Sequence, residues 1–334
     1  MAHNIHIENG KACLMVVRQP PWHGLGTVLN SPPTAAQAMK AANLDWQVRK
    51  VPLYAIDIGG AAQVLDRFAV VPEHRWGRPE CPVLGVVGRE YVPLQNADAF
   101  SFFDEIVGAK AAEYETAGAL GNGERVWILA KLPGQIHVVG DDITHKYLLL
   151  ANGHDGRTCV QIKLTPVRVV CQNTLTAALN DGKRGISVHH GRGFWNRMRS
   201  AQQALGIINH RFVQLESDFK RMADIQLDQA QLDAYLQAVF PDPKHDHDRF
   251  VQMVRRDRDE CGRLFETGPG NDLPKVRGTL WAAFNGVTGY VDHVRGGGSI
   301  CEQRLKSIWF GRGQQIKWRA YSMARQWPKL PNGN

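Results

Sequence analysis

The chain has 334 residues, of which 43% are hydrophobic and 22% charged, and its formal net charge is +8. This composition excludes a disordered chain and is typical of one large or two moderate folded domains. The sequence contains no run of 18 or more apolar residues, so no membrane span is predicted. The N-terminal residues lack a secretory signal pattern, so we expect a cytoplasmic protein. The six cysteines form no C-x-x-C pair, and we expect them to be reduced thiols.

The first 110 residues are predicted to mix short strands with two helices. One helix is expected over 34–46. Ser31 or Thr34 provides its start signal, and two prolines precede the helix. The second is expected over 96–108, with Asn96 as its N-cap. Short apolar runs between prolines and glycines fill the interval and indicate strands.

The segment 113–175 is predicted to be a meander of strands. Asn122-Gly123 separates two strand-like runs, and this dipeptide is a strong hairpin signal because both residues accept positive φ. A second tight turn is expected over 153–156, and a third strand ends at Cys171. A helix should follow.

The rest of the chain is predicted to be mainly helical. Apolar residues from Met198 to Met222 recur at spacings of three and four, which predicts one long amphipathic helix from residue 194. Further helices are expected over 228–239, 249–265 and 279–294.

Together these elements predict an α+β fold, in which an antiparallel strand meander packs against a long helix and the C-terminal part is mostly helical. The strand-rich domain is expected to span 1–193. The helical region spans 194–334 and is either separate or part of the same domain.

Positive charge is concentrated in two segments. Residues 156–200 hold eight basic residues against one acid, a net charge of +7. Residues 303–334 hold seven basic residues and no acid, again +7. A split of this kind favours a polyanionic partner, although two ordinary basic surfaces on a solvated protein would give the same count.

The role of Cys171 has two interpretations, and so does the role of the three polar residues that follow it. Cys171 would need a nearby base to act as a nucleophile, and none is evident, so a buried cysteine at a strand end is the plainer interpretation. Gln172, Asn173 and Thr174 lie where a helix exposes unpaired N–H groups. They are expected either to hold a phosphate or to cap the helix.

A metal-dependent hydrolase is the alternative enzyme hypothesis. His154 and Asp155 would take part in its site, with further ligands from elsewhere, such as the histidines of 245–247. A polar turn that presents His154 and Arg157 to a ligand is the competing interpretation.

The stretch 188–199 interleaves basic and aromatic residues. Phe194 and Trp195 stand among two histidines and three arginines, a mixture that can follow a phosphate backbone and stack on bases. Alternatively, Trp195 begins the long helix and packs into the core.

Several motifs together resemble a known family. They are "WHGLGT", "YETAGALGNGERVWILAKL", "NGHDG", "PVRVVCQNTL" and "GTLWAAFNGVTGYVDH", running from about Trp22 to about His293. They resemble the phage- and plasmid-related proteins of domain-of-unknown-function family 932, which implies a mobile-element or prophage setting and no particular activity. By fold analogy alone, a strand hairpin, further strands and a long helix with a basic surface also look like single-strand annealing proteins of the Rad-fifty-two type.

We therefore expect a phage- or plasmid-associated protein that binds single-stranded DNA, possesses no cofactor or metal, and forms a homo-oligomer with no membrane contact. An annealing recombinase is the specific form of this hypothesis. The alternatives are the hydrolase or nuclease above and a non-enzymatic interaction protein of a mobile element. The residues expected to contact nucleic acid are Arg157, Lys163, Arg168, Lys183, Arg184, His189, His190, Arg192, Trp195, Arg197 and Arg199.

Overall fold

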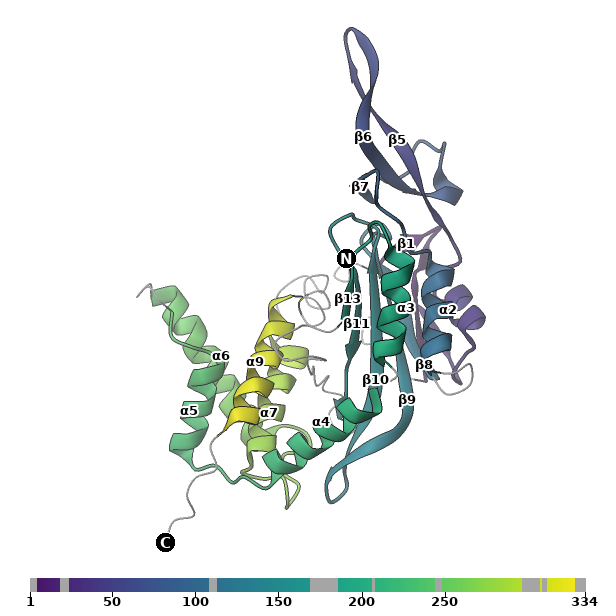
Figure 1. Cartoon of the computed structure of the whole chain (residues 1–334). Helices are drawn as coiled ribbons and strands as arrows, with labels where there is room; N and C mark the ends of the chain where they lie inside the picture. The colour runs from purple at the N-terminus through teal and green to yellow at the C-terminus, as the bar shows by residue number, and fades with distance from the viewer. Residues whose placement is uncertain are drawn as a thin grey trace.

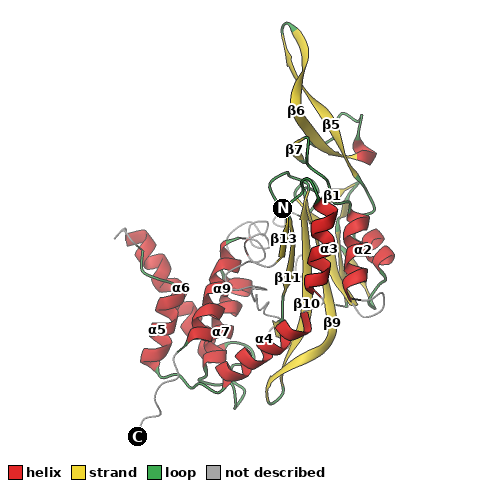
Figure 2. Cartoon of the chain, in the orientation of Figure 1, coloured by secondary structure: helices red, strands yellow, loops and turns green. Residues whose placement is uncertain are grey.

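The structure is a computed structural model that describes residues 5–18, 24–107, 113–168, 186–205, 208–243, 248–295, 307 and 311–327. It has the α+β fold that the sequence predicts, with a sheet, a projecting arm of strands and a lobe of helices (Figure 2). None of the helices within these residues is long and apolar enough to cross a membrane.

The main sheet has the strand order β13-β11-β10-β9-β8-β3-β4, with β12 also paired to β10. The predicted meander is present as β8 to β11, which pair antiparallel in sequence order. The sheet as a whole is mixed, because β4 lies parallel to β3. Its strands are β3 (Leu14–Val17), β4 (Thr27–Leu29), β8 (Glu113–Leu120), β9 (Arg125–Val139), β10 (Asp142–Gly153), β11 (Val160–Leu164), β12 (Val167–Arg168) and β13 (Ile186–Val188).

The predicted hairpin around Asn122-Gly123 joins β8 to β9. Leu120 pairs with Arg125, so the connection has four residues and not two. Positive φ occurs at Gly121 and Gly123, where it carries little steric penalty, and not at Asn122. The hairpin prediction is confirmed, but its turn is longer than the dipeptide rule implies.

A three-stranded arm projects from one end of the sheet (Figure 1). It contains β5 (Val48–Asp57), β6 (Gly60–Pro72) and β7 (Gly85–Gly88), all antiparallel, and a single 3₁₀ turn, η1 (Glu73–Arg75), follows β6. Its outer half has little to pack against, since most residues between Tyr54 and Arg67 are exposed. A separate two-stranded hairpin, β1 (Ile7–Glu8) and β2 (Lys11–Ala12), lies near the N-terminus.

Two short helices pack on the sheet within the predicted ranges, although the first ends at Ala41 and not at residue 46. α1 (Ala35–Ala41) begins at Thr34, whose side chain forms a capping box with Gln37. α2 (Asn96–Val107) follows the arm. Asn96 is the first residue of α2 and not its predicted N-cap, because its buried amide donates to the carbonyls of Leu44 and Trp46.

The prediction of one long helix is not confirmed. The structure describes two helices instead, α3 (Phe194–Leu205) and α4 (Ile208–Ala223), and residues 206–207 between them lie outside the described part of the chain. α3 lies along the sheet, whereas α4 runs from the sheet toward the helical lobe (Figure 1). The apolar stripe continues through both helices, but α3 contacts β13 and α2, whereas α4 contacts β9, α7 and α9.

The helical lobe contains the predicted C-terminal helices. They are α5 (Gln229–Val239), α6 (Asp248–Thr267), α7 (Leu280–Gly289), a π-helical turn η2 (Tyr290–Val294) and α9 (Arg312–Gln326). All ten residues of α7 are buried, so this helix is the centre of the lobe. One hydrophobic cluster includes both Ile128 of β9 and Phe284 of α7, so sheet and lobe share a core.

Candidate nucleic-acid interface

A group of exposed cations gathers where the arm joins the sheet. Glu90 follows β7, and the guanidinium of Arg192 donates to both of its carboxylate oxygens at 3.0 Å. This hydrogen-bonded pair lowers the pKa of Glu90, and the charges of Arg89 and Lys50 lower it further. Three cations therefore surround one carboxylate, and the local charge is positive.

Lys50 holds the backbone on either side of Glu90. Its Nζ donates to the backbone carbonyls of Arg89 and Tyr91, each at 2.8 Å, and lies 5.1 Å from the ring centroid of Phe68. Arg67 lies opposite Gly88 in the β6–β7 register and is exposed. The bend after β7 is thus held in one conformation, with Arg67 and Arg89 at its surface.

The loop before α3 adds Arg192 and Arg197 to this surface. Arg197 donates to the carbonyls of Arg192 at 2.6 Å, His189 at 2.8 Å and Gly191 at 3.1 Å. These bonds order the loop while the guanidinium remains exposed. Arg199, also exposed, donates to Asn196 within α3.

The turn between β10 and β11 brings Arg157 to the same end of the sheet. One oxygen of Asp155 accepts from the N–H groups of Arg157 and Thr158, so the turn is rigid. The turn also packs tightly on β7, where a Cβ on Gly85 would lie 2.5 Å from the backbone of Asp155. We call the exposed cations gathered here the arm-base surface: Arg67, Arg89, Arg157, Arg192 and Arg197.

Trp195 lies at the edge of this surface. Its side chain is 46% exposed, and its ring contacts the buried ring of Phe194 edge-on at 5.1 Å. Phe194 stacks on His190 at 5.2 Å, and His190 stacks on Tyr91 at 4.9 Å. Of the two expected roles, core packing therefore falls to Phe194, and Trp195 keeps a face in solvent.

His190 does not join the exposed surface expected of it. It is buried, and its Nδ1 bonds to the carbonyl of Val92 at 2.9 Å. Burial lowers the pKa of its imidazole, which favours the neutral form. His189 next to it is exposed, so the alternation of the chain puts one histidine inside and one outside.

Lys163 is likewise buried rather than presented to a ligand. Only 3% of it is exposed, and its Nζ lies 3.1 Å from the side-chain oxygen of Gln314 in α9. Arg168 is in β12, where it pairs with Thr144. The described residues do not include Cys171, which was expected at a strand end, the phosphate or helix-cap candidates Gln172, Asn173 and Thr174, or the expected nucleic-acid contacts Lys183 and Arg184.

The described cations of the second basic segment are Arg312, Lys317, Arg319 and Arg325, all in α9. Lys317 is wholly buried and pairs with Asp292 at 2.8 Å, and Arg319 donates to the carbonyl of Val239. Both are in α9, which packs in the helical lobe away from the arm (Figure 1). Lys317 and Arg319 therefore do not join the arm-base surface.

His154 and Asp155 lack the geometry of a hydrolytic site. His154 is completely buried, with its Nε2 3.3 Å from Asn96 Oδ1. Burial, helped by the nearby His190, lowers the pKa of His154 to about 3. Asp155 accepts hydrogen bonds from Thr158 and Arg125 in addition to its turn. Both side chains hold the turn in place, so the described residues give the hydrolase hypothesis no support.

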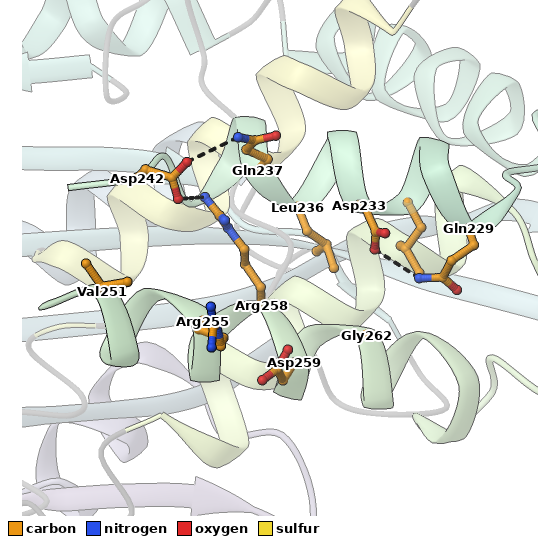
Figure 3. A pocket seen from close by; sticks show the side chains of 11 residues that line it. Gln229, Asp233, Leu236, Gln237, Asp242, Val251, Arg255, Arg258, Asp259 and Gly262 are labelled. Carbon is orange, nitrogen blue, oxygen red and sulfur yellow. Dashed lines mark hydrogen bonds and ion pairs between the residues drawn. The ribbon is translucent and has the colours of Figure 1, made fainter. Parts of the chain in front are cut away.

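A pocket of about 560 Å³ lies between α5 and α6 (Figure 3). Arg258 crosses it to reach Asp242 at 2.8 Å and the carbonyl of Phe240. Arg255 and Asp259 also line it, so its walls carry both signs of charge. No pair of groups in this pocket has the nucleophile–base geometry of a catalytic site among the described contacts.

The arm contributes cations that no local sequence pattern assigns to this surface. Arg67 and Arg89 are far from 156–200 along the chain, and only the fold brings them beside Arg192. A signal was present in 46–56, where basic and aromatic residues alternate as they do in 188–199. In the folded arm, Arg49 lies over the ring of the exposed Trp76, with 5.9 Å between guanidinium and ring centroid.

Comparison with known proteins identifies the family. No curated protein and no solved structure matches the chain significantly. A family model described as a domain of unknown function, DUF932, matches residues 83–320. The match begins at β7 and continues into α9, so it covers the main sheet strands from β8 onward and most of the helical lobe. The chain belongs to the DUF932 family.

Proposed function

We propose that this protein binds single-stranded DNA across the arm-base surface. The observation that supports this most directly is a set of five exposed arginines beside the exposed indole of Trp195; among the ion pairs of the described residues, these arginines have one partner, Glu90. Arginines bind phosphates through a rigid set of donors, and an exposed aromatic ring stacks on bases without sequence preference. No metal or nucleotide takes part in this proposal.

Single strands are favoured over duplex by the character of the surface. An exposed tryptophan at the edge of a basic patch can stack only on a base that is not already stacked within a duplex. The setting of a mobile element, implied by the resemblance to phage and plasmid proteins, is one in which strand protection and annealing are required. Strand annealing is the specific activity we propose to test after binding.

The arm provides a basis for the homo-oligomer that annealing proteins form. Tyr54, Ile56, Ile58 and Leu65 are apolar and highly exposed near its tip. Exposed apolar groups of this size on a projecting hairpin are typical of a protein contact. We propose that the tip packs on a second copy of the chain, so that successive arm-base surfaces follow one DNA strand.

The binding test is fluorescence anisotropy with labelled single-stranded and duplex DNA over a salt series. For single strands, log K should fall with log salt by about 0.7 per phosphate contact. The variant Arg89→Ala/Arg192→Ala should weaken binding and reduce that slope by roughly 1.4. The matched control Arg249→Ala/Arg256→Ala removes the same charge from exposed sites on α6 and should leave both unchanged.

Equal effects of the two double variants would indicate only a general charge effect, and would reject the arm-base surface. Absence of binding at low salt would reject the DNA proposal. A protein partner that survives nuclease treatment in a pull-down would then favour the interaction-protein alternative. Light scattering on the wild-type sample and on Ile56→Asp/Leu65→Asp tests the oligomer, which the variant should dissociate.

A further inference from the structure

A buried cluster of potential metal ligands lies at the N-terminal hairpin, apart from the arm-base surface. His6, Glu8 and Cys13 each have less than 6% of their surface exposed. One ligand atom from each, a ring nitrogen, a carboxylate oxygen and the thiol sulfur, lies within 4.8 Å of the other two. The backbone brings them together, because Cys13 N–H donates to the His6 carbonyl across the hairpin at 2.7 Å.

The orientation of His6 is the first sign of a cation site. Its Nδ1 lies 3.2 Å from the carbonyl oxygen of Gly121, which can only accept, so Nδ1 carries a proton. The other nitrogen, Nε2, is then directed at an oxygen of Glu8 at 3.4 Å. A histidine that donates one N–H to a backbone carbonyl and directs its other nitrogen at a carboxylate has the arrangement found at protein metal sites.

The spacing of these two atoms agrees with an ion between them. A charge-assisted N–H···O bond is usually about 2.7–2.9 Å long, which is shorter than the 3.4 Å seen here. Two ligands of a tetrahedral zinc ion, each bound at about 2.0–2.1 Å, lie roughly 3.3–3.4 Å apart. The observed separation therefore matches the edge of a zinc tetrahedron better than a direct hydrogen bond.

Cys13 is placed to act as a thiolate ligand. Its sulfur lies 3.5 Å from the side-chain Nδ2 of Asn43 and also accepts from the backbone N–H of Glu8. Both neighbours donate to the sulfur, but burial raises the pKa of the free thiol to about 11, so a bound metal ion would have to displace its proton. The side chain is completely buried, so a metal bound here would be shielded from competing solvent.

The outer oxygen of Glu8 is held by a second set of residues. His74 Nε2 lies 2.5 Å from this oxygen, and Arg75 Nε lies 2.9 Å from it. Both belong to η1 at the base of the arm. They fix the carboxylate so that its inner oxygen faces His6, as second-layer partners do in metal sites.

We propose that His6 Nε2, Glu8 and Cys13 Sγ bind a zinc ion, with a water molecule as the fourth ligand. A thiolate, an imidazole and a carboxylate are a donor set that zinc accepts and that hard cations such as magnesium do not. Through the contacts of Glu8 with His74 and Arg75, the ion links the N-terminal hairpin to the arm. This proposal is independent of DNA binding.

The test uses the full-length protein, purified under reducing conditions and stripped with a chelator. Titration with cobalt(II) should produce a thiolate-to-cobalt charge-transfer band and the visible bands of tetrahedral cobalt, which zinc then removes. Cys13→Ser should abolish the charge-transfer band, whereas Cys81→Ser and Cys159→Ser, at half-buried cysteines elsewhere, should retain it. His74→Ala should keep the band and weaken zinc binding by about 10- to 100-fold.

Elemental analysis should find one zinc per wild-type chain, and zinc should raise the melting temperature of the stripped protein. If Cys13→Ser does not fold, the stripped wild-type chain still decides the question through its cobalt spectrum. A wild-type spectrum without the charge-transfer band would overturn the proposal and identify the cluster as a buried ion-pair network. A band that persists in Cys13→Ser would assign the thiolate to another cysteine and also overturn it.

Discussion

Trp281 and Asp142 are hydrogen-bonded in the interior between the sheet and the helical lobe. The indole Nε1 of Trp281 lies 2.7 Å from a carboxylate oxygen of Asp142, and both residues are fully buried. Trp281 belongs to α7 and Asp142 opens β10, so this bond fixes the central helix of the lobe on the sheet. The two parts should therefore unfold together.

Trp281→Phe tests this coupling. The variant removes the indole N–H while keeping an aromatic ring, and it deprives a buried carboxylate of a donor. We expect a loss of about 1–3 kcal/mol in the free energy of unfolding, measured with urea. Trp195→Phe, at an exposed tryptophan, should change it by less than about 0.5 kcal/mol. Equal stabilities for the two variants would contradict the role given to the bond.

Lys317→Met tests whether the basic C-terminal segment is structural. Lys317 and Asp292 form a buried ion pair, and removing one member leaves the other charge without this partner. We expect a loss of about 3–5 kcal/mol in the free energy of unfolding. Asp292→Asn/Lys317→Met should lose less, because neither charge remains, and differential scanning calorimetry of the two variants measures the difference. DNA affinity of folded Lys317→Met should equal that of wild type, and a reduced salt slope would show that Lys317 contacts phosphate.

Local signals account for the parts of the fold that the sequence predicted well. The helix start at Thr34 and the hairpin near Gly123 depend on residues close together in the sequence. The single long helix, which the structure does not confirm, depends on contacts with distant segments. Met198 and Phe212 belong to one apolar stripe. Met198 is in α3, which packs on β13, whereas Phe212 is in α4, which packs on β9. The ring of Phe212 also lies under the ammonium group of Lys146.

The candidate site was predicted only in part, because solvent exposure depends on distant segments. Alternation along β11 does not reveal that Gln314, about 150 residues later, lies against Lys163. Nor does any local pattern place Arg89 beside Arg192, which requires the arm to return to the loop before α3. Charge counts along the sequence identify a basic stretch, but the tertiary structure decides which of its residues are exposed and which are buried.

The acid stability of the protein should depend on His154. Burial lowers the pKa of this imidazole to about 3, while the unfolded chain has a value of about 6.5. Between these values the unfolded state binds a proton that the folded state does not, so stability falls as pH drops below about 6.5. The contribution is absent above that pH and approaches about 1.4 kcal/mol per pH unit below it.

His154→Gln cannot take up this proton. The variant should be less stable than wild type near neutral pH, because packing on Trp46 is lost, but it should lose less stability on acidification. Urea unfolding at a series of pH values measures both quantities. His189→Gln, at an exposed histidine, is the control and should follow the wild-type profile. A wild-type profile in His154→Gln would show that other groups determine the acid response.

The contact between β7 and the β10–β11 turn should be sensitive to a single methyl group. In Gly85→Ala the new Cβ would meet the backbone of Asp155 at 2.5 Å, and backbone cannot rotate away as a side chain does. We expect a loss of about 1–3 kcal/mol in the free energy of unfolding. Displacement of this turn also moves Arg157 away from the arm, so DNA affinity should fall if the arm-base surface binds it.

Gly262→Ala is the matched control for that substitution. Gly262 lies inside α6, and a Cβ there would have open space around it. The same change should therefore stabilise the protein by about 0.5–1 kcal/mol, because alanine is the better helix former. Thermal melts of the two variants should shift in opposite directions. A stabilised Gly85→Ala would show that the turn has room to move and that Arg157 is not fixed beside the arm.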